Sequence, residues 1–306
     1  MAVTEWGWVR MAWLVDLSSG ERARLVARWD TVGESGGAEA SVSADGRYLL
    51  AASVGAHGTS ALHLVTVETG EIQVLRDETR AHAMQPRLSP AGQRFAFLRV
   101  VDGADDGLWS ALVGEEPRRI AGPFGEPVEI LGWSGDGELL AFRQGLDPSR
   151  VRVVPAAGGP IQDAGPGFYA DWRDGDPDLL VSGSAGDGTY GIWTYSTTSG
   201  ERREVGLGSR VADARWQPGG NLIAYLENAG PGQGTVLTRD LATGSIVRVD
   251  DGSGFLFDLF WSADGASLFA RRGGDDSTTR IIDLLGRHPG VGLCLRGGGP
   301  PPEPCL

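Results

Sequence analysis

The stretch Trp261-Ser262-Ala263-Asp264-Gly265 decides the fold, because near-copies of it recur along the chain. Five copies stand upstream, at Val42-Ser43-Ala44-Asp45-Gly46, Leu88-Ser89-Pro90-Ala91-Gly92, Trp133-Ser134-Gly135-Asp136-Gly137, Trp172-Arg173-Asp174-Gly175-Asp176 and Trp216-Gln217-Pro218-Gly219-Gly220. Ser, then Pro or Ala, then Asp or Gly, then Gly suits a type I turn that leads into a glycine bulge. An alternating apolar run precedes each turn and a short apolar run follows it, so each copy predicts a β-hairpin of two strands, a and b.

A second signature follows each hairpin: an apolar strand c, a polar turn with Gly, and a short strand d. It reads Leu64-Val65-Thr66-Val67-Glu68-Thr69-Gly70-Glu71 in one copy and Leu237-Thr238-Arg239-Asp240-Leu241-Ala242-Thr243-Gly244 in another. The two signatures share a period: the first places its glycine at 46, 92, 137, 175, 220 and 265, and the second at 20, 70, 114, 158, 200, 244 and 286. A period near 45 with four short strands and no amphipathic helix is typical of a β-propeller blade.

These motifs resemble the TolB-like family of WD-type propeller repeats, whose signature is a Trp-Ser-Pro-Asp-Gly turn, an apolar strand and an Asp-x-x-Thr-Gly turn. The resemblance extends from Met1 to about Leu295. It implies an all-β propeller that binds a protein, a peptide or a polar ligand without catalysis. The chain departs from the family pattern where the fourth turn moves its Gly, and where Val42 and Leu88 replace Trp.

The repeats predict six complete blades and one partial blade. The complete blades are expected to begin near Gly36, Arg80, Gly125, Gly165, Ser209 and Gly254. Aligning Asp16 with Asp283 sets residues 1–5 beside 268–272 without a gap, so the chain opens inside a strand b whose strand a is missing. We therefore expect seven blades with the first incomplete; the alternative is six blades, with the N-terminal strands pairing with the last one.

The domain prediction is a single propeller domain over residues 1–295, followed by a Gly/Pro-rich tail over 296–306. The tail cannot supply a central strand, because proline lacks the N–H that a sheet ladder needs. We expect it to be an end segment or a linker.

The charge balance excludes some classes of partner. Acidic residues number 40 and basic residues 27, the formal net charge is −13, and every basic residue is Arg. Nucleic acid and membrane insertion are not expected, because the former needs a basic patch and no apolar run approaches the ~20 residues of a membrane helix. We expect a monomer and a bacterial, GC-rich source.

The compartment stays open. No signal peptide is visible, and Cys294 and Cys305 are compatible with either redox environment. A chain truncated at its N-terminus would belong to the periplasm or the extracellular space, and a complete one to the cytoplasm.

The strongest candidate site is a row of polar residues on strand a, the strand expected to line the propeller axis. The positions one and three residues before the Trp position share a face of this strand. The predicted ligand-binding residues in this axial channel are Glu39, Gln85, Arg87, Asp171, Asp213, Arg215 and Asp258. Such a set suits a cation or a polar ligand. The alternative is that these side chains satisfy one another through ion pairs and hydrogen bonds between blades.

No complete catalytic or metal-binding pattern is found in the sequence. The four histidines lack metal-ligand spacing, although His57 and His82 are expected in loops of neighbouring blades. Gly33-Glu34-Ser35-Gly36-Gly37 matches a hydrolase nucleophile motif but has no helix after it. We therefore predict no metal, no cofactor and no catalytic residue. The leading hypothesis is a non-enzymatic binding or scaffold module; the alternatives are a propeller lyase or hydrolase with an axial acidic or metal site, and the propeller portion of a longer exported protein.

Overall fold

A computed structural model of the chain describes residues 2–3, 11–14, 24–28, 39–54, 59–146, 149–173, 175–208, 210–230, 233–250, 255–273, 278–285, 293–296 and 303–304. Every regular element in these ranges is a β-strand. They contain no helix that is long and apolar enough to span a membrane.

The chain divides into two compact units, and each is described by itself. Unit 1 comprises Met1–Leu140, Val154–Ile161 and Gly297–Pro302, and unit 2 comprises Ala141–Val153, Gln162–Arg296 and Glu303–Leu306. The division runs through the sheet β12(Val128–Trp133)-β13(Leu139–Gln144)-β14(Arg150–Pro155)-β15(Gln162–Pro166).

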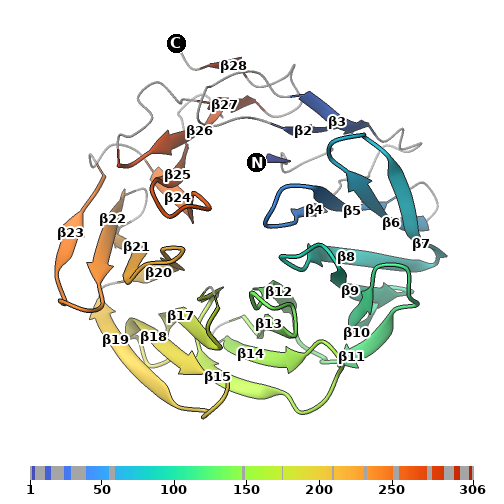
Figure 1. Cartoon of the computed structure of the whole chain (residues 1–306). Helices are drawn as coiled ribbons and strands as arrows, with labels where there is room; N and C mark the ends of the chain where they lie inside the picture. The colour runs from blue at the N-terminus through green and yellow to red at the C-terminus, as the bar shows by residue number, and fades with distance from the viewer. Residues whose placement is uncertain are drawn as a thin grey trace. The chain divides into compact units, whose positions relative to one another are not determined.

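Unit 1 contains three further sheets, whose strands can be followed in Figure 1. Their strand orders are β1(Ala2–Val3)-β2(Met11–Leu14)-β3(Arg24–Arg28), β4(Glu39–Val42)-β5(Tyr48–Val54)-β6(Thr59–Thr66)-β7(Ile72–Thr79) and β8(Ala81–Leu88)-β9(Arg94–Val101)-β10(Ala104–Leu112)-β11(Arg118–Ala121).

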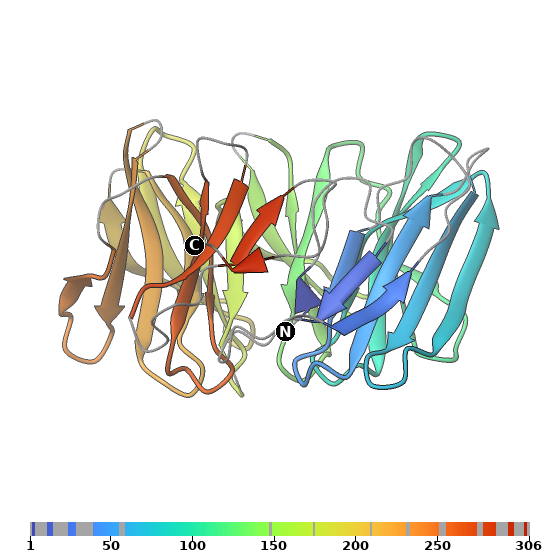
Figure 2. The ribbon, with the colours of Figure 1, turned by 90° about the horizontal axis from the view of Figure 1, so that it is seen from above.

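Unit 2 contains the other three sheets, and all strand neighbours in them whose register is described are antiparallel. Figure 2 shows the strands within a sheet side by side. Their orders are β16(Tyr169–Trp172)-β17(Asp178–Ser184)-β18(Tyr190–Ser196)-β19(Arg202–Gly208), β20(Val211–Trp216)-β21(Leu222–Gly230)-β22(Gln233–Asp240)-β23(Ile246–Arg248) and β24(Phe255–Trp261)-β25(Leu268–Gly273)-β26(Thr278–Asp283)-β27(Leu293–Arg296)-β28(Glu303–Pro304).

The predicted repeat boundaries match the observed sheets. The six sheets after the first begin at Glu39, Ala81, Val128, Tyr169, Val211 and Phe255. The N-terminal strands form a separate sheet of three, as expected for a repeat that lacks strand a. The tail contributes one short strand, β28, which pairs with β27 at the edge of its sheet, where proline is tolerated.

The turn motif folds as its chemistry requires. In the first copy, the Gly46 N–H donates to the Ser43 carbonyl, and Gly46 has φ of +70°, which favours glycine. The Ser43 hydroxyl donates to Asp45 Oδ1 at 2.6 Å and accepts the Tyr48 N–H at 3.0 Å. The same Ser-to-Asp bond, also 2.6 Å long, recurs in the turns at Ser134 and Ser262. Each turn is therefore fixed by its own side chains.

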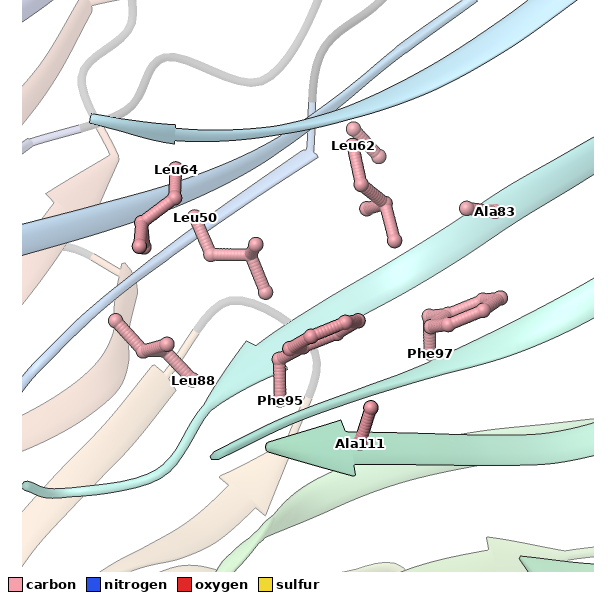
Figure 3. Packing of buried hydrophobic residues seen from close by; sticks show 9 residues of the cluster. Leu50, Leu62, Leu64, Ala83, Leu88, Phe95, Phe97 and Ala111 are labelled. Carbon is pink, nitrogen blue, oxygen red and sulfur yellow. The ribbon is translucent and has the colours of Figure 1, made fainter. Parts of the chain in front are cut away.

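Apolar side chains of neighbouring sheets form the core. In unit 1, Leu50 and Leu62 of one sheet face Phe95 and Phe97 of the next (Figure 3), and all four side chains are almost fully buried. Burying one such side chain contributes about 1.5–3 kcal/mol. In unit 2, Leu180, Trp216 and Tyr225 and other residues pack in the same way between two sheets. The faces that an isolated sheet would expose are thus covered by its neighbours in sequence.

One segment differs from its expected form. By comparison with the other repeats, the sequence predicts a longer b–c loop at Asp102-Gly103-Ala104-Asp105-Asp106-Gly107. Instead, β9 ends at Val101 and β10 begins at Ala104, so only Asp102 and Gly103 connect the two strands. Both have positive φ, +49° and +81°, which is the type I′ geometry that Asp-Gly favours in two-residue hairpins.

Candidate ligand-binding residues on the first strands

The first strand of each complete sheet has a free edge, because it pairs with only one strand of its own sheet. Within unit 1, β4 contacts β8, and β8 contacts β12. Within unit 2, β16 contacts β20, and β20 contacts β24. The backbone N–H groups on these free edges need acceptors from the neighbouring sheet or from solvent. The predicted site residues lie on these strands.

In unit 1, Gln85 joins β8 to β12 through both ends of its side-chain amide. Its Oε1 accepts the Ile130 N–H at 2.8 Å, and its Nε2 donates to the Val128 carbonyl at 3.2 Å. A shorter polar side chain acts similarly one sheet earlier, where Ser41 Oγ accepts the Leu88 N–H at 3.0 Å. Gln85 is therefore committed to holding two sheets together.

In unit 2, two aspartates take the same role. Asp171 Oδ2 accepts the Trp216 N–H at 2.7 Å, which joins β16 to β20. Asp213 Oδ2 accepts the Leu259 N–H at 2.6 Å, which joins β20 to β24. A hydrogen bond to a charged acceptor contributes about 1.5–3 kcal/mol, more than a neutral one. These carboxylates are thus structural links between sheets.

Three of the polar side chains lie at β-bulges with a left-handed backbone. Gln85, Asp213 and Asp258 occupy the same repeat position and have φ of +52°, +48° and +53°. The pairing register of β8, β20 and β24 shifts at each of these positions, which marks a β-bulge. Positive φ is uncommon outside glycine and concentrates at functional or tightly constrained positions. At these three positions, therefore, a polar side chain coincides with a bulge and a strained backbone.

Arg215 lies between two of the predicted carboxylates. Its Nη2 is 2.6 Å from Asp213 Oδ1, and its Nη1 is 3.7 Å from Asp171 Oδ1. Burial would by itself lower the pKa of Arg215, but the charges of Asp213 and Asp171, with a smaller contribution from Asp258, outweigh burial and raise the pKa above its usual value. The guanidinium therefore stays charged and balances the two carboxylates.

Asp258 differs from Asp213 in its surroundings. Its Oδ2 pairs with Arg271 Nη1 of β25 at 2.8 Å. The Asp258 side chain is 57% exposed, whereas that of Asp213 is 4% exposed. The Asp258 carboxylate is therefore the most accessible charged group of the candidate site in unit 2.

The remaining predicted residues are placed as follows. Glu39 pairs through its backbone with Ala52, and its side chain lies outside the described residues. The Arg87 side chain donates to the Pro86 carbonyl at 3.2 Å, and its own carbonyl accepts the Trp133 indole N–H at 3.0 Å. The axial channel involves both units and stays a prediction.

Sequence reasoning missed three residues that belong with this set. Ser60 Oγ accepts the Ala83 N–H, and Ser182 Oγ accepts the Ala214 N–H, each at 3.1 Å. Both serines are buried, and a small polar residue buried in a strand needs a hydrogen-bond partner, but other polar residues of the same strands carry the same signal. Arg271, the partner of Asp258, lies within β25 and gives no such signal in the sequence.

The residues considered for metal binding or catalysis are placed as follows. His82 lies in strand β8, paired with Val100, and not in a loop as expected. His57 and the Gly33–Gly37 motif lie outside the described residues. Within the described ranges, no group of three or more His, Cys, Asp or Glu side chains is arranged to hold a metal ion.

Comparison with known proteins gives similarity without a matching family model. The Tricorn protease homolog 1 of Streptomyces coelicolor is 28% identical over 232 residues, which cover 70% of this chain and 21% of that protein. The crystal structure of TolB from Acinetobacter baumannii superposes with a TM-score of 0.55 at 15% identity, over 96% of this chain and 61% of that one. Oligogalacturonate lyase from Vibrio parahaemolyticus gives a TM-score of 0.62 at 14% identity, over 94% and 84%.

These similarities, together with the repeated antiparallel sheets, define the chain as an all-β protein with a β-propeller fold built from four-stranded blades, the first of them incomplete. It is similar in structure to TolB. The chain spans about a fifth of the tricorn homolog and less than two thirds of the TolB chain, and two of these three relatives are enzymes by name.

Proposed function

We propose that the chain is a non-enzymatic, TolB-like binding module with WD-type repeats, and that the exposed ion pair of Asp258 and Arg271 is the centre of its recognition surface. The proposal rests on a difference in burial between two equivalent residues, Asp213 and Asp258. Asp213 is buried and bonded to the next sheet, whereas Asp258 has the same backbone conformation but is 57% exposed. A charged group that is rigidly held and still accessible is what specific binding requires.

The charge of the molecule indicates the kind of ligand. The formal net charge is −13, so long-range attraction favours a partner with positive charge. The pair itself offers one carboxylate and one guanidinium, which suits the adjacent N–H and C=O groups of a peptide. A basic or zwitterionic peptide segment therefore fits this surface better than an anion does.

The proposal is tested with fluorescein-labelled peptides of basic, neutral and acidic composition, whose affinities are measured by fluorescence anisotropy. We expect basic peptides to bind the unaltered protein, and to bind the double variant Asp258→Asn/Arg271→Gln at least about tenfold more weakly. The matched control is Glu201→Gln/Arg203→Gln, because that pair is equally short at 2.8 Å but lies exposed at the start of β19. No binding by any peptide, or equal binding by all three proteins, would contradict the proposal.

The second candidate is a lyase or hydrolase that uses the acidic residues Asp171, Asp213 and Asp258, and the names of the tricorn homolog and the oligogalacturonate lyase favour it. Turnover of oligogalacturonate or of peptides by the purified chain, with or without added divalent metal, would support it. The absence of turnover, combined with peptide binding, would leave the binding module. The chain also fits the propeller portion of a longer exported protein, because it covers 21% of the tricorn homolog.

A further inference from the structure

We infer that Asp258 binds a peptide from a partner protein. The peptide lies extended beside β24, as the first strand of a following sheet would, and donates a backbone N–H to the Asp258 carboxylate. This inference deepens the proposed function and rests on it, because it names the occupant of the same surface. It concerns the peptide backbone, whereas the proposed function concerns charge.

Three first strands have equivalent β-bulges. Gln85, Asp213 and Asp258 share the repeat position, the register shift and a φ within a few degrees of +50°. The first two each accept a backbone N–H from the first strand of the following sheet: Ile130 donates to Gln85, and Leu259 donates to Asp213. At both positions, the bulge places a side-chain acceptor where the N–H of a neighbouring strand can reach it. Asp258 lies on the same kind of bulge.

Only one of the two Asp258 carboxylate oxygens has a hydrogen bond to a residue that the structure describes. Asp213 places one carboxylate oxygen on Arg215 and the other on the Leu259 N–H. Asp258 places Oδ2 on Arg271, and Oδ1 has no hydrogen bond to any residue that the structure describes. A strand lying beside β24 would give Oδ1 the N–H that Asp213 already has, and would cover the exposed carboxylate.

The other two bulges indicate the occupant. At both equivalent bulges the donor is a backbone N–H of an extended first strand, Ile130 of β12 and Leu259 of β24. An extended segment of the same kind is therefore the occupant that fits Asp258. Main-chain hydrogen bonds tolerate varied sequences, and alternate side chains select among them, as in other cases of strand addition.

A peptide copied from the chain itself supplies the probe. Residues 209–219, Ser-Arg-Val-Ala-Asp-Ala-Arg-Trp-Gln-Pro-Gly, contain a soluble first strand. Ala214 in this segment stands two residues before Trp216, as Leu259 stands two before Trp261. A fluorescein-labelled copy is titrated into the full chain, beside a copy that carries an N-methyl group on the nitrogen equivalent to Ala214. The methyl group removes the single N–H that Asp258 is proposed to accept.

The protein variant is Asp258→Gly, which removes the carboxylate but retains a residue suited to positive φ. Asp258→Asn, which keeps an acceptor oxygen, is the second variant. We expect the unmethylated peptide to bind the unaltered protein, to lose about tenfold or more in affinity for Asp258→Gly, and to lose less for Asp258→Asn. The N-methylated peptide should bind the unaltered protein as weakly as the parent peptide binds Asp258→Gly.

Other outcomes overturn the inference in distinguishable ways. If both peptides bind equally and both lose affinity with Asp258→Gly, the surface binds peptides, but not by strand addition. If neither binds while basic peptides of the composition panel do, the proposed function stands and the strand receptor fails. If Asp258→Gly lowers the unfolding midpoint as much as Asp213→Gly does, a segment of the chain's own already occupies the position, and no partner strand is received.

Discussion

Replacing Asp213 by Asn is expected to destabilise the protein far more than the same change at Asp258. The two residues share a repeat position and a left-handed backbone, which Asn tolerates, so the comparison isolates the side-chain contacts. At Asp213, the charged bond to the Leu259 N–H becomes neutral, at a cost of about 1–1.5 kcal/mol. The Asn side chain also has no charge to pair with Arg215, so the ion pair between Asp213 Oδ1 and Arg215 Nη2, 2.6 Å long, is lost. This loss costs a similar amount of free energy.

The expected loss in the free energy of unfolding is therefore about 2–3 kcal/mol for Asp213→Asn. For Asp258→Asn it is less than about 1 kcal/mol, because the Asp258 side chain is 57% exposed and solvent screens its pair with Arg271. Urea unfolding followed by tryptophan fluorescence gives both values. Amide exchange gives a local reading: a loss of this size lowers the protection of the Leu259 amide about 30- to 150-fold. Equal stability of the two variants, or unchanged protection at Leu259, would refute the structural role of Asp213.

Three further predictions concern other parts of the repeat. Gln85→Leu keeps most of the side-chain volume but leaves the Ile130 N–H without its acceptor, so urea unfolding should show a loss of about 1–3 kcal/mol in the free energy of unfolding. An unchanged midpoint would contradict the role of Gln85 in joining β8 to β12. Hydrogen bonds, first from Ser43 and then from Arg47, lower the pKa of Asp45 from 3.8 to about 2, so its folded carboxylate binds fewer protons than its unfolded one. Its contribution to stability is present above pH 3.8 and is lost as the pH falls through about 2, and Ser43→Ala should flatten the acid dependence of the urea midpoint over that window. Gly107→Ala places a Cβ against backbone at a φ of +96°, and calorimetry should show a loss of about 2–4 kcal/mol, which a near-normal melting temperature would disprove.

The fold could be read from the sequence because its decisive interactions are local. Ser43, Asp45 and Gly46 close their turn through contacts within five residues, so the residue types alone reveal it. The repetition of this turn then fixes the spacing of the sheets. The three-stranded form that the described residues give the N-terminal sheet was visible for the same reason, since an alignment of repeats shows which strands a partial copy contains.

The site was less predictable because its contacts join residues about 45 positions apart, as Asp213 and Leu259 do. The pattern placed Gln85, Asp171 and Asp213 on the correct strands, but it left open whether they bind a ligand or each other. The structure commits all three to neighbouring sheets. The bulge at Asp213 could not be foreseen, because an Asp in an alternating strand looks the same with regular or left-handed backbone.

The hairpin at Asp102 and Gly103 shows the opposite error. Its Asp-Gly pair is a strong local signal for a two-residue turn, but the segment 102–107 was interpreted as a longer loop. The turn is short because two residues with positive φ match the twist of the paired strands.

The measurement that tests the account most directly is hydrogen exchange of the full chain with and without a saturating amount of the 209–219 peptide, read by mass spectrometry. Gln85 of β8 and Asp213 of β20 already accept an N–H from the next first strand, whereas Asp258 of β24 is exposed. We therefore predict added protection within Phe255–Gly273, where β24 and β25 lie, and none within Ala81–Leu88 or Val211–Trp216. Protection confined to those earlier strands, or no protection anywhere in the chain, would contradict the account.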